Sequence, residues 1–541
     1  MEISIPFTKI LSFLCSFLIF SVSWDVLAQT QPDIQKGFLH CLHSKDGYNN
    51  SIPNIIYTPN NPSYTPTLLS SIQNIRFLSP DHTKPLAIIT PLKNMHVQSA
   101  VSCAKNYNIQ IRVRCGGHDY EGLSYLSYFK QPFIIVDLRN LSSISIDTKT
   151  KTAWIGGGVR LGGLYHAIAE KSPNLAFPAG TCPSVGSGGH VSGGGEGALT
   201  RKFGLAADNM IDAKIVNADG AILDRKSMGE DLFWAIRGGG AASFGIIVAY
   251  KLKLVDIPTI VTVFAPNRTL EQNATQLIYK WQHVAYKFDR DLFVRILITR
   301  VNLNGTLTVQ GQFQSLFLGR VEKLLPLMQE SFPELGLKKE DCTEMKWIEA
   351  VLFFSDLPSG STVNDLVLSS SYPKRYYKAK SDYVVDPISE IALEGLWKRF
   401  YEKEAERAQL IFSPSGGRMF EIPESETPYP HRAGNLYQIQ HLVYWTEEEN
   451  AQSQIYIDWI RRLYKYMAPF VSKSPRGAYL NYRDLDLGEN KEGNKTTYAQ
   501  ASTWGLKYFK NNFYRLARVK TLADPSNLFR NEQSIPPFST S

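Results

Sequence analysis

Short hydrophobic runs mark the elements of the first half of the chain. Residues 85–90 form an apolar run typical of a strand, a helical pattern follows as far as residue 106, and residues 109–114 alternate as a strand does. Further elements are indicated by strand patterns at 133–138, 152–155, 213–217 and 245–254 and by a helical pattern at 164–170. This mixture predicts an α+β fold divided into two lobes.

The pattern changes after Ile257 and Pro258, where the predicted strands become longer. Residues 292–298 and 306–310 alternate as antiparallel strands do, and helical patterns occupy 321–331, 387–410 and 447–467. We therefore expect a second domain, beginning at residue 258, in which helices cover one face of an antiparallel sheet.

The N-terminus has the features of a secretory signal peptide over residues 1–28. It carries an early lysine, an apolar run at 10–22 and small residues at 26–28. That run is shorter than the roughly 20 residues of a membrane span, and no later segment competes with it. We expect a soluble protein of the secretory pathway, destined for the apoplast or the vacuole. Six N-glycosylation sequons fit this route, at Asn49, Asn140, Asn267, Asn273, Asn304 and Asn494.

Composition excludes several classes of protein. The 541 residues are 43% hydrophobic and 12% aromatic, which suits a monomeric multi-domain globular chain and not a disordered one. The net charge is +8, but basic and acidic residues are interleaved, so no nucleic-acid partner is expected. No cluster of histidine, cysteine and carboxylate has metal-ligand spacing, so no metal is expected.

Two glycine-rich stretches carry the main chemical signal. Residues 182–197 read C-P-S-V-G-S-G-G-H-V-S-G-G-G-E-G, and residues 114–122 read R-C-G-G-H-D-Y-E-G. Glycine recurs in this way where φ must be positive or where a ligand touches the main chain. Neither stretch has the G-x-G-x-x-G spacing and downstream acidic residue of a Rossmann site. His118 in one stretch and Cys182 in the other offer two covalent anchors for one cofactor.

These stretches resemble the flavin-binding core of the plant berberine bridge enzyme-like oxidases, which are vanillyl-alcohol-oxidase-type flavoproteins. The resemblance covers nearly the whole mature chain, and the cannabinoid acid synthases look closest; further matching blocks lie at 205–209, 227–235, 238–240, 482–486 and 531–537. It implies FAD bonded bicovalently, through its 8α carbon to His118 and through C6 to Cys182. It also implies a two-lobed α+β FAD-binding domain at 29–257, a substrate-binding domain at 258–475 and a C-terminal segment, 476–541, that returns to the first domain.

The resemblance assigns further roles around the cofactor. Val185 is implied to lie against the flavin, where valine leaves room for dioxygen and leucine closes it. Cys41 and Cys103 are implied to form a disulfide, whereas Cys115 and Cys342 are expected to be unreactive thiols. The implied cofactor contacts are Arg114, Cys115, Gly116, Gly117, His118, Asp119, Cys182, Val185, Gly186, Gly188, Gly189, His190, Gly193, Gly245, Ile247 and Asn481.

Three residues are predicted to be catalytic. Tyr482 matches the tyrosine to which the family assigns proton abstraction, and its pKa would have to fall from near 10, with help from nearby cations. Glu196 stands where the family usually has the tyrosine of G-G-G-Y-G, and it is either a substitute acid or base or a sign that the proton network is lost. Gln438 is expected to face the substrate.

The predicted substrate contacts are Arg295, Leu297, Ser415 and Gln438. Cannabinoid synthases have histidine and tyrosine at the positions of Leu297 and Ser415, so we expect a different substrate. On a strand, residues 438 and 440 point to one side and 441 to the other. His441 is therefore expected to be a core histidine, and His190 to be part of the flavin-loop fold.

Three functions remain open from the sequence. The first is an oxidase or oxidative cyclase that takes a hydride from a phenolic, prenylated plant metabolite and passes electrons to dioxygen, giving hydrogen peroxide. The second is a cyclase of the Diels-Alderase type that keeps flavin as a redox-silent scaffold. The third is a carbohydrate or monolignol oxidase, which the apolar Leu297 disfavours.

Overall fold

The computed structural model describes residues 31–538 apart from 47–51, 80–81, 369–371 and 494–495. The predicted signal peptide and the sequons at Asn49 and Asn494 therefore lie outside the described residues. The remaining sequons, at Asn140, Asn267, Asn273 and Asn304, are exposed. None of the helices in the described ranges is both long enough and apolar enough to cross a bilayer.

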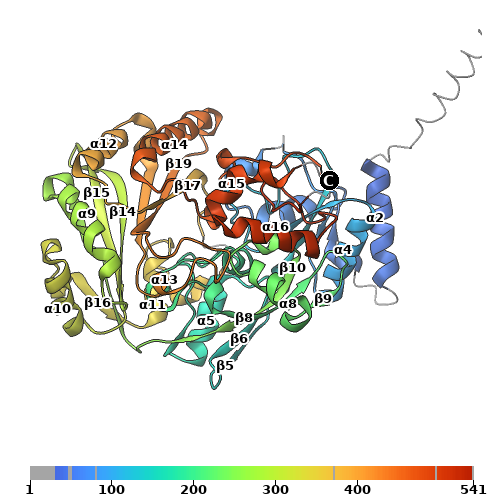
Figure 1. Cartoon of the computed structure of the whole chain (residues 1–541), viewed down its shortest axis with the longest axis horizontal. Helices are drawn as coiled ribbons and strands as arrows, with labels where there is room; N and C mark the ends of the chain where they lie inside the picture. The colour runs from blue at the N-terminus through green and yellow to red at the C-terminus, as the bar shows by residue number, and fades with distance from the viewer. Residues whose placement is uncertain (1–30, 47–51, 80–81, 369–371, 494–495, 539–541) are drawn as a thin grey trace, which may run out of the picture.

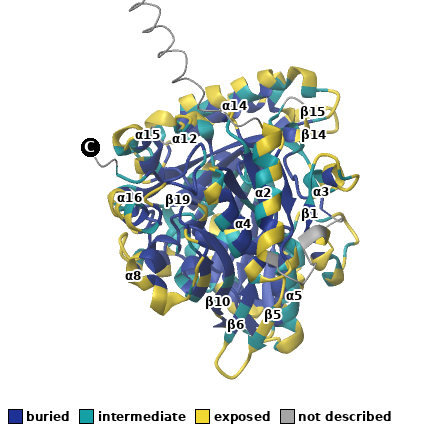
Figure 2. Ribbon diagram, turned by 90° about the vertical axis from the view of Figure 1, so that its right-hand side faces the viewer, coloured by how far each residue is buried: buried dark blue, intermediate teal, exposed yellow. Residues whose placement is uncertain are grey.

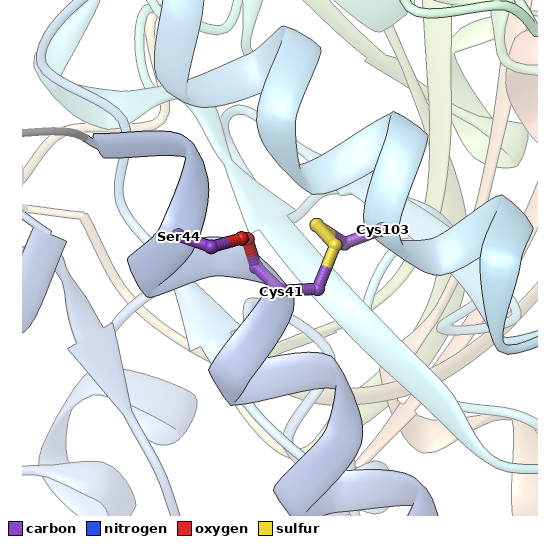
Figure 3. Close-up of a disulfide and its surroundings, with 3 residues drawn as sticks. All are labelled: Cys41, Ser44 and Cys103. Carbon is purple, nitrogen blue, oxygen red and sulfur yellow. A yellow bond between two sulfur atoms is a disulfide. The ribbon is translucent and has the colours of Figure 1, made fainter.

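The first lobe is built on a four-stranded sheet with the order β1 (Ile56–Tyr57), β2 (Ile88–Ile89), β4 (Phe133–Asp137), β3 (Gln110–Arg114). Strands β2, β4 and β3 are parallel, and α4 (Asn94–Asn106) forms the crossover that a parallel pair requires. Helix α2 (Gln31–Asp46) packs on α4. A disulfide joins Cys41 of α2 to Cys103 of α4 (Figure 3), as the resemblance implied.

The second lobe is a five-stranded antiparallel sheet with the order β5 (Ile144–Asp147), β6 (Thr152–Gly156), β10 (Ile246–Lys253), β8 (Met210–Val216), β9 (Ile222–Leu223). Helices α5 (Leu161–Lys171) and α8 (Arg225–Ala235) pack on this sheet, with Leu164, Ile168 and Phe233 in one buried cluster. A capping box between Asp224 and Ser227 fixes the start of α8. The two predicted α+β lobes are therefore present.

The middle of the chain forms a large antiparallel sheet. Its order is β16 (Cys342–Met345), β12 (Val261–Phe264), β15 (Thr306–Phe317), β14 (Leu292–Leu303), β18 (Ala408–Pro414), β19 (Tyr437–Trp445), β17 (Tyr376–Val384), and β13 (Asn267–Thr269) pairs with β15. Its outer face is covered by α9 (Ala274–Val284), α10 (Val321–Ser331), α12 (Glu390–Phe400) and α14 (Ser453–Met467), as Figure 1 shows. Figure 2, in which α2 faces the viewer, shows α14 at one edge of the molecule with an exposed outer side.

The predicted helix at 387–410 is wrong beyond residue 400. Helix α12 ends at Phe400, and after a short 3₁₀ turn the chain enters strand β18. The physical reason is a change of hydrophobic period, because Leu410 and Phe412 are buried in the helix-covered core while Ile411 faces the other way. That spacing of two residues belongs to a strand.

Strict alternation gives the large sheet two different faces. On β14, Val294, Ile296 and Ile298 pack into the core beneath the helices, whereas Arg295 and Leu297 point to the opposite side. The inner face therefore carries side chains that are free to meet a ligand.

The C-terminal segment packs against the two lobes. Helices α15 (Tyr498–Phe509) and α16 (Asn512–Ala523), red in Figure 1, share a buried cluster with α8 through Trp504, Phe513 and Phe233. Lys520 is wholly buried and donates from Nζ to the carbonyl oxygens of Ser243 (2.6 Å) and Phe529 (2.7 Å).

A buried ion cluster, consisting of Glu121, Lys378, Lys380, Asp484 and Asp486, joins all three parts of the molecule. Lys378 on β17 pairs with Glu121 of the first lobe and with Asp484 at 2.8 Å, and Lys380 pairs with Asp484 at 2.6 Å and Asp486 at 2.7 Å. Burial acts to raise the pKa of Asp484, but the two lysines outweigh it and hold this pKa below its ordinary value.

We expect Lys378→Met to destabilise the fold by about 3–5 kcal/mol at pH 7, because Glu121 and Asp484 would lose a buried partner. A matched control is Lys105→Met, which breaks the exposed pair with Asp219 and should cost less than about 1 kcal/mol. Because the pKa of Asp484 is lowered on folding, the cluster's contribution is fully present above the unfolded pKa of about 4 and is lost as pH falls from there through the lower folded-state pKa. Thermal denaturation of both variants at pH 7 and at about pH 2 tests this, and equal destabilisation at pH 7 would contradict it.

Candidate active site

A cavity of about 880 Å³ lies where the two lobes, the inner face of the large sheet and the C-terminal segment meet. This volume is at the upper end of the range for small-molecule sites. Two of its walls are residues 114–122, here called the first glycine loop, and residues 182–197, called the second glycine loop. The other walls are alternate residues of β14, β15, β18 and β19 and the short segment around Tyr482.

Glycine allows the two loops to touch. A Cβ at Gly116 would lie 2.4 Å from the backbone nitrogen of Gly186 in the other loop. Gly117 has a φ of 70°, and a Cβ there would lie 1.7 Å from the carbonyl oxygen of Ser71. The turn that presents His118 to the cavity therefore requires glycine.

His118 and Cys182 meet across a single serine. Ser184 Oγ lies 2.8 Å from His118 Nε2 and 3.4 Å from Cys182 Sγ. Burial, followed by the charge of Arg160, lowers the pKa of His118 to about 3, so its imidazole is neutral at physiological pH. Burial raises the pKa of Cys182, and the hydrogen bond from Ser184 acts against this rise.

The cavity has the chemistry to hold FAD. The side chains of His118 and Cys182, which can both form covalent bonds, line one wall of the cavity. The glycines beside them leave the main chain without side chains. A Cβ at Gly189 would meet no atom within 4 Å, so the backbone there is open to the cavity. Bare backbone of this kind lets a large flat ring approach closely.

Most of the other predicted cofactor contacts also lie on the cavity wall: Cys115, Gly116, Gly117, Asp119, Val185, Gly186, Gly188, Gly189, His190, Gly193, Gly245, Ile247 and Asn481. His190 Nε2 accepts a hydrogen bond from the Gly180 amide at 2.8 Å, and burial lowers its pKa to about 4. Asn481 donates to the His190 carbonyl at 3.0 Å, so the C-terminal segment is fastened to the second glycine loop. Burial raises the pKa of Cys115 to about 11, as expected of an unreactive thiol.

Arg114 is the exception among the predicted cofactor contacts. It does not reach the cavity, because its guanidinium is fully buried against Asp137 at 2.7 Å and donates to the carbonyl oxygens of Thr67 and Leu68. A buried guanidinium needs its donors satisfied, and these partners satisfy them. Its role is to hold the strand before the first glycine loop.

The opposite wall is the inner face of the large sheet. The predicted substrate contacts Arg295, Leu297 and Ser415 all lie on it. Arg295 donates from Nε to Gln314 at 2.8 Å and lies 5.1 Å from the Phe354 ring centroid. This face therefore combines apolar, aromatic and polar groups.

Gln440 is a cavity residue that was not singled out from the sequence. Its Nε2 donates to the hydroxyl of Tyr120 at 2.6 Å, and it pairs across the sheet with Ile411, which pairs with Leu297. Strand alternation in the sequence could have identified it, because residues 438 and 440 share one side of a strand. His441 points to the other side, where it is fully buried and contacts Asp382 at 2.9 Å, as expected of a core histidine.

Tyr482 enters the cavity from the C-terminal segment. Its ring stacks on Tyr120 with centroids 5.5 Å apart and meets Tyr479 edge-on at 4.9 Å. Burial and then the charge of Glu196 raise the pKa of Tyr482, and Arg295 acts in the opposite direction. The predicted lowering of this pKa by cations is therefore outweighed, because one arginine does not compensate for burial and a nearby carboxylate.

Glu196 is the centre of a hydrogen-bonded group, here called the carboxylate cluster, with Tyr383, Tyr429 and Gln438. Its Oε1 accepts from the Tyr429 hydroxyl, from Gln438 at 3.2 Å and from Tyr383 at 3.4 Å, and none of these bonds uses Oε2. Burial raises the pKa of Glu196 to about 7, and the tyrosine hydrogen bonds offset part of that rise.

Gln438 donates a hydrogen bond to Glu196 and does not line the cavity. Glu196 and Tyr429 are on the cavity wall, whereas Gln438 and Tyr383 lie behind them, with Gln438 donating to the Tyr383 hydroxyl at 2.9 Å. Its predicted contact with the substrate stays a prediction. The tyrosines of the cluster carry no sequence signal, because their contact with Glu196 comes only from the tertiary fold.

Comparison with known proteins agrees with this geometry. A family profile described as "FAD binding domain" matches residues 85–225, and one described as "Berberine and berberine like" matches residues 478–536. Berberine bridge enzyme-like 18 of Arabidopsis thaliana is 48% identical over 537 residues, which cover 98% of this chain and 99% of that protein. Tetrahydroberberine oxidase of Berberis wilsoniae is 50% identical over 508 residues, 93% of this chain and 94% of that protein.

Solved structures agree as well. The structure of berberine bridge enzyme-like 28 from Arabidopsis thaliana superposes with a TM-score of 0.88 at 48% identity, covering 93% of this chain and all of that chain. The two flavin-domain lobes, the sheet-lined cavity and this similarity over nearly the full length lead to one conclusion. The chain belongs to the berberine bridge enzyme-like family of FAD-dependent oxidases, with the vanillyl-alcohol-oxidase-type α+β fold.

Proposed function

We propose that this enzyme is an oxidase or oxidative cyclase acting on a phenolic, prenylated plant metabolite, with FAD attached through both His118 and Cys182. The observation that carries the proposal is the cavity itself. The two proposed attachment residues lie on one wall, an aromatic and apolar sheet face lies opposite, and the carboxylate cluster borders the space between them. FAD bound there supplies a hydride acceptor whose electrons then pass to dioxygen, forming hydrogen peroxide.

The sheet face suits an aromatic substrate that carries hydroxyl groups. Leu297 and Ile411 on the sheet, together with the neighbouring ring of Phe354 from the helix Trp347–Phe354, offer apolar contact for rings and prenyl chains. Arg295 and Gln440 offer hydrogen-bond donors. A mainly apolar pocket with a few placed polar groups orients such a molecule in one way.

Glu196 is the proposed proton acceptor. A carboxylate whose pKa is about 7 is ionised often enough at neutral pH to take a proton and is basic enough to hold it. Tyr482, whose pKa is raised, remains a neutral phenol and positions the substrate by donating a hydrogen bond. This assigns the base role to Glu196 and a positioning role to the tyrosine that the family resemblance put forward as base.

The same observation on Tyr482 favours a second candidate function. A neutral Tyr482 beside Arg295 provides two donors that could activate a carbonyl for a pericyclic addition, with flavin as a redox-silent scaffold. Anaerobic mixing with prenylated phenols separates the two functions, because only an oxidase bleaches the flavin absorbance.

Secretion is part of the proposal. The Cys41–Cys103 disulfide and the four exposed sequons support a route through an oxidising compartment.

We expect FAD to remain with the polypeptide after acid denaturation, because two bonds would have to break. His118→Ala or Cys182→Ala alone should leave one link, and the double variant should release all flavin. Intact-protein mass spectrometry measures each state. Complete release of flavin from the unmodified enzyme would refute both attachments.

We expect kcat/KM to rise with pH through about 7, because Glu196 must lose its proton before it can accept another. Glu196→Gln should remove this limb of the pH profile and lower the rate at pH 8 by about 10²-fold, while flavin content stays unchanged. Stopped-flow flavin reduction from pH 5 to pH 9 is the measurement. A profile unchanged by the substitution would exclude Glu196 as base.

Tyr482→Phe should also retain its flavin but lower turnover without moving the pH profile, because it removes a positioning hydroxyl and not the titrating group. Tyr514→Phe, an exposed tyrosine on α16, is the matched control and should behave as the parent enzyme. If Tyr482→Phe abolishes the pH limb, then Tyr482 and not Glu196 is the base.

Val185 lines the cavity three residues after Cys182 and is proposed to admit dioxygen. Val185→Leu should slow reoxidation of the reduced enzyme about tenfold, roughly 1.4 kcal/mol of barrier, because the added methylene would occupy the space in which dioxygen is proposed to approach the flavin. Val185→Ala should reoxidise at least as fast as the parent. Stopped-flow reoxidation at several oxygen concentrations tests this, and an unchanged rate constant in the leucine variant would rule the gate out.

A further inference from the structure

The two proposed attachment residues share one hydroxyl, that of Ser184. This side chain is buried, and its Oγ lies 2.8 Å from His118 Nε2 and 3.4 Å from Cys182 Sγ. The loop that carries it is held by the backbone, since the Val185 amide donates to the Cys182 carbonyl at 3.2 Å. Ser184 is therefore fixed between the two groups.

A hydroxyl has one proton, so the directions of the two contacts are linked. In one arrangement Ser184 donates to His118 Nε2, and the imidazole proton then sits on Nδ1, which cannot act as a nucleophile. In the other arrangement His118 Nε2–H donates to Oγ, and the Ser184 hydroxyl donates to the Cys182 sulfur. Only the second arrangement leaves a lone pair on Nδ1 and stabilises a thiolate at the same time.

We propose that Ser184 is the positioning residue for covalent attachment of the cofactor, orienting His118 through Nε2 so that Nδ1 reacts, and donating to the Cys182 sulfur so that it reacts as a thiolate. This inference rests on the attachment through His118 and Cys182 proposed above. It assigns one side chain to both bonds, so removing its hydroxyl should affect both.

The charge states of the two partners agree with this direction. Burial lowers the pKa of His118 to about 3, so the ring is a neutral donor and not an imidazolium. Burial raises the pKa of Cys182, and the largest influence opposing that rise is the Ser184 hydroxyl. Without Ser184 the buried thiol would keep its proton more strongly.

Each bond is a two-electron oxidation with dioxygen as the acceptor. For the first, the His118 Nδ1–C8α bond forms, a C8α–H bond breaks and the Nε2 proton leaves toward Ser184 Oγ. For the second, the Cys182 S–C6 bond forms while the S–H and C6–H bonds break. Each link releases two electrons and two protons, which convert one dioxygen to hydrogen peroxide.

The test is the rate of covalent attachment in full-length enzyme produced under flavin limitation and then given FAD in air. Samples quenched in acid are analysed by intact-protein mass spectrometry, which counts flavin bound covalently, while anaerobic quenching of FAD fluorescence reports non-covalent binding. Ser184→Thr and Ser184→Val form a matched pair of equal shape that differ in the hydroxyl. We expect attachment in the threonine variant to stay within about threefold of the parent and attachment in the valine variant to fall at least tenfold, with FAD binding similar in both.

The two bonds are followed separately in the His118→Ala and Cys182→Ala backgrounds. The proposal requires loss of the hydroxyl to slow the remaining bond in each background, and an effect on only one bond overturns the shared role. Equal attachment rates in the threonine and valine variants overturn it as well. If the unmodified enzyme itself binds FAD but never attaches it, the covalent attachment proposed above fails, and that result is distinct from a failure of Ser184.

Discussion

The buried ion cluster is the interaction on which the cavity depends. Glu121 lies in the first glycine loop, three residues after His118, and Asp484 lies two residues after Tyr482. Lys378 on β17 binds both carboxylates, so one ammonium group connects the first glycine loop, the large sheet and the C-terminal segment. Lys378, Glu121 and Asp484 are nearly inaccessible to water, so these three groups tolerate little displacement before an unpaired charge is left behind.

The close approach of the two glycine loops determines what the cavity can hold. The contact between Gly116 and Gly186 brings His118 and Cys182 to one wall, where they share Ser184. A side chain on either glycine would clash with the other loop, because a Cβ at Gly116 would lie 2.4 Å from the Gly186 nitrogen and one at Gly186 would lie 2.5 Å from the Gly116 nitrogen. The same lack of side chains leaves bare main chain for a flat ring, so one structural feature serves both attachment and binding.

The proposed proton transfer depends on the surroundings of Glu196 and Tyr482. Burial works against ionisation of both Tyr482 and Glu196, but the hydrogen bonds from Tyr429 and Tyr383 and the charge of Arg432 limit the rise in the pKa of Glu196 to about 7. Tyr482 has ring contacts in place of donors, so burial keeps its phenol protonated. The proposed division of roles between a carboxylate and a neutral phenol therefore follows from where the hydrogen-bond donors are placed.

Local patterns in the sequence predicted the main strands of the two lobes and the proposed attachment pair. The periods of strands and helices depend on which face is buried, and the glycine loops depend on backbone conformation. Both leave a local pattern in the sequence, and the glycine pattern surrounds His118 and Cys182. The tertiary structure alone decided the partners of those residues. Tyr383 and Tyr429 contact Glu196 although they lie 187 and 233 residues further along the chain. Arg114 pairs with Asp137 and does not reach the cavity. Gln440 lines the cavity, whereas Gln438 does not. Burial and hydrogen bonding between distant segments set these outcomes, including the raised pKa of Tyr482, and no local pattern encodes them.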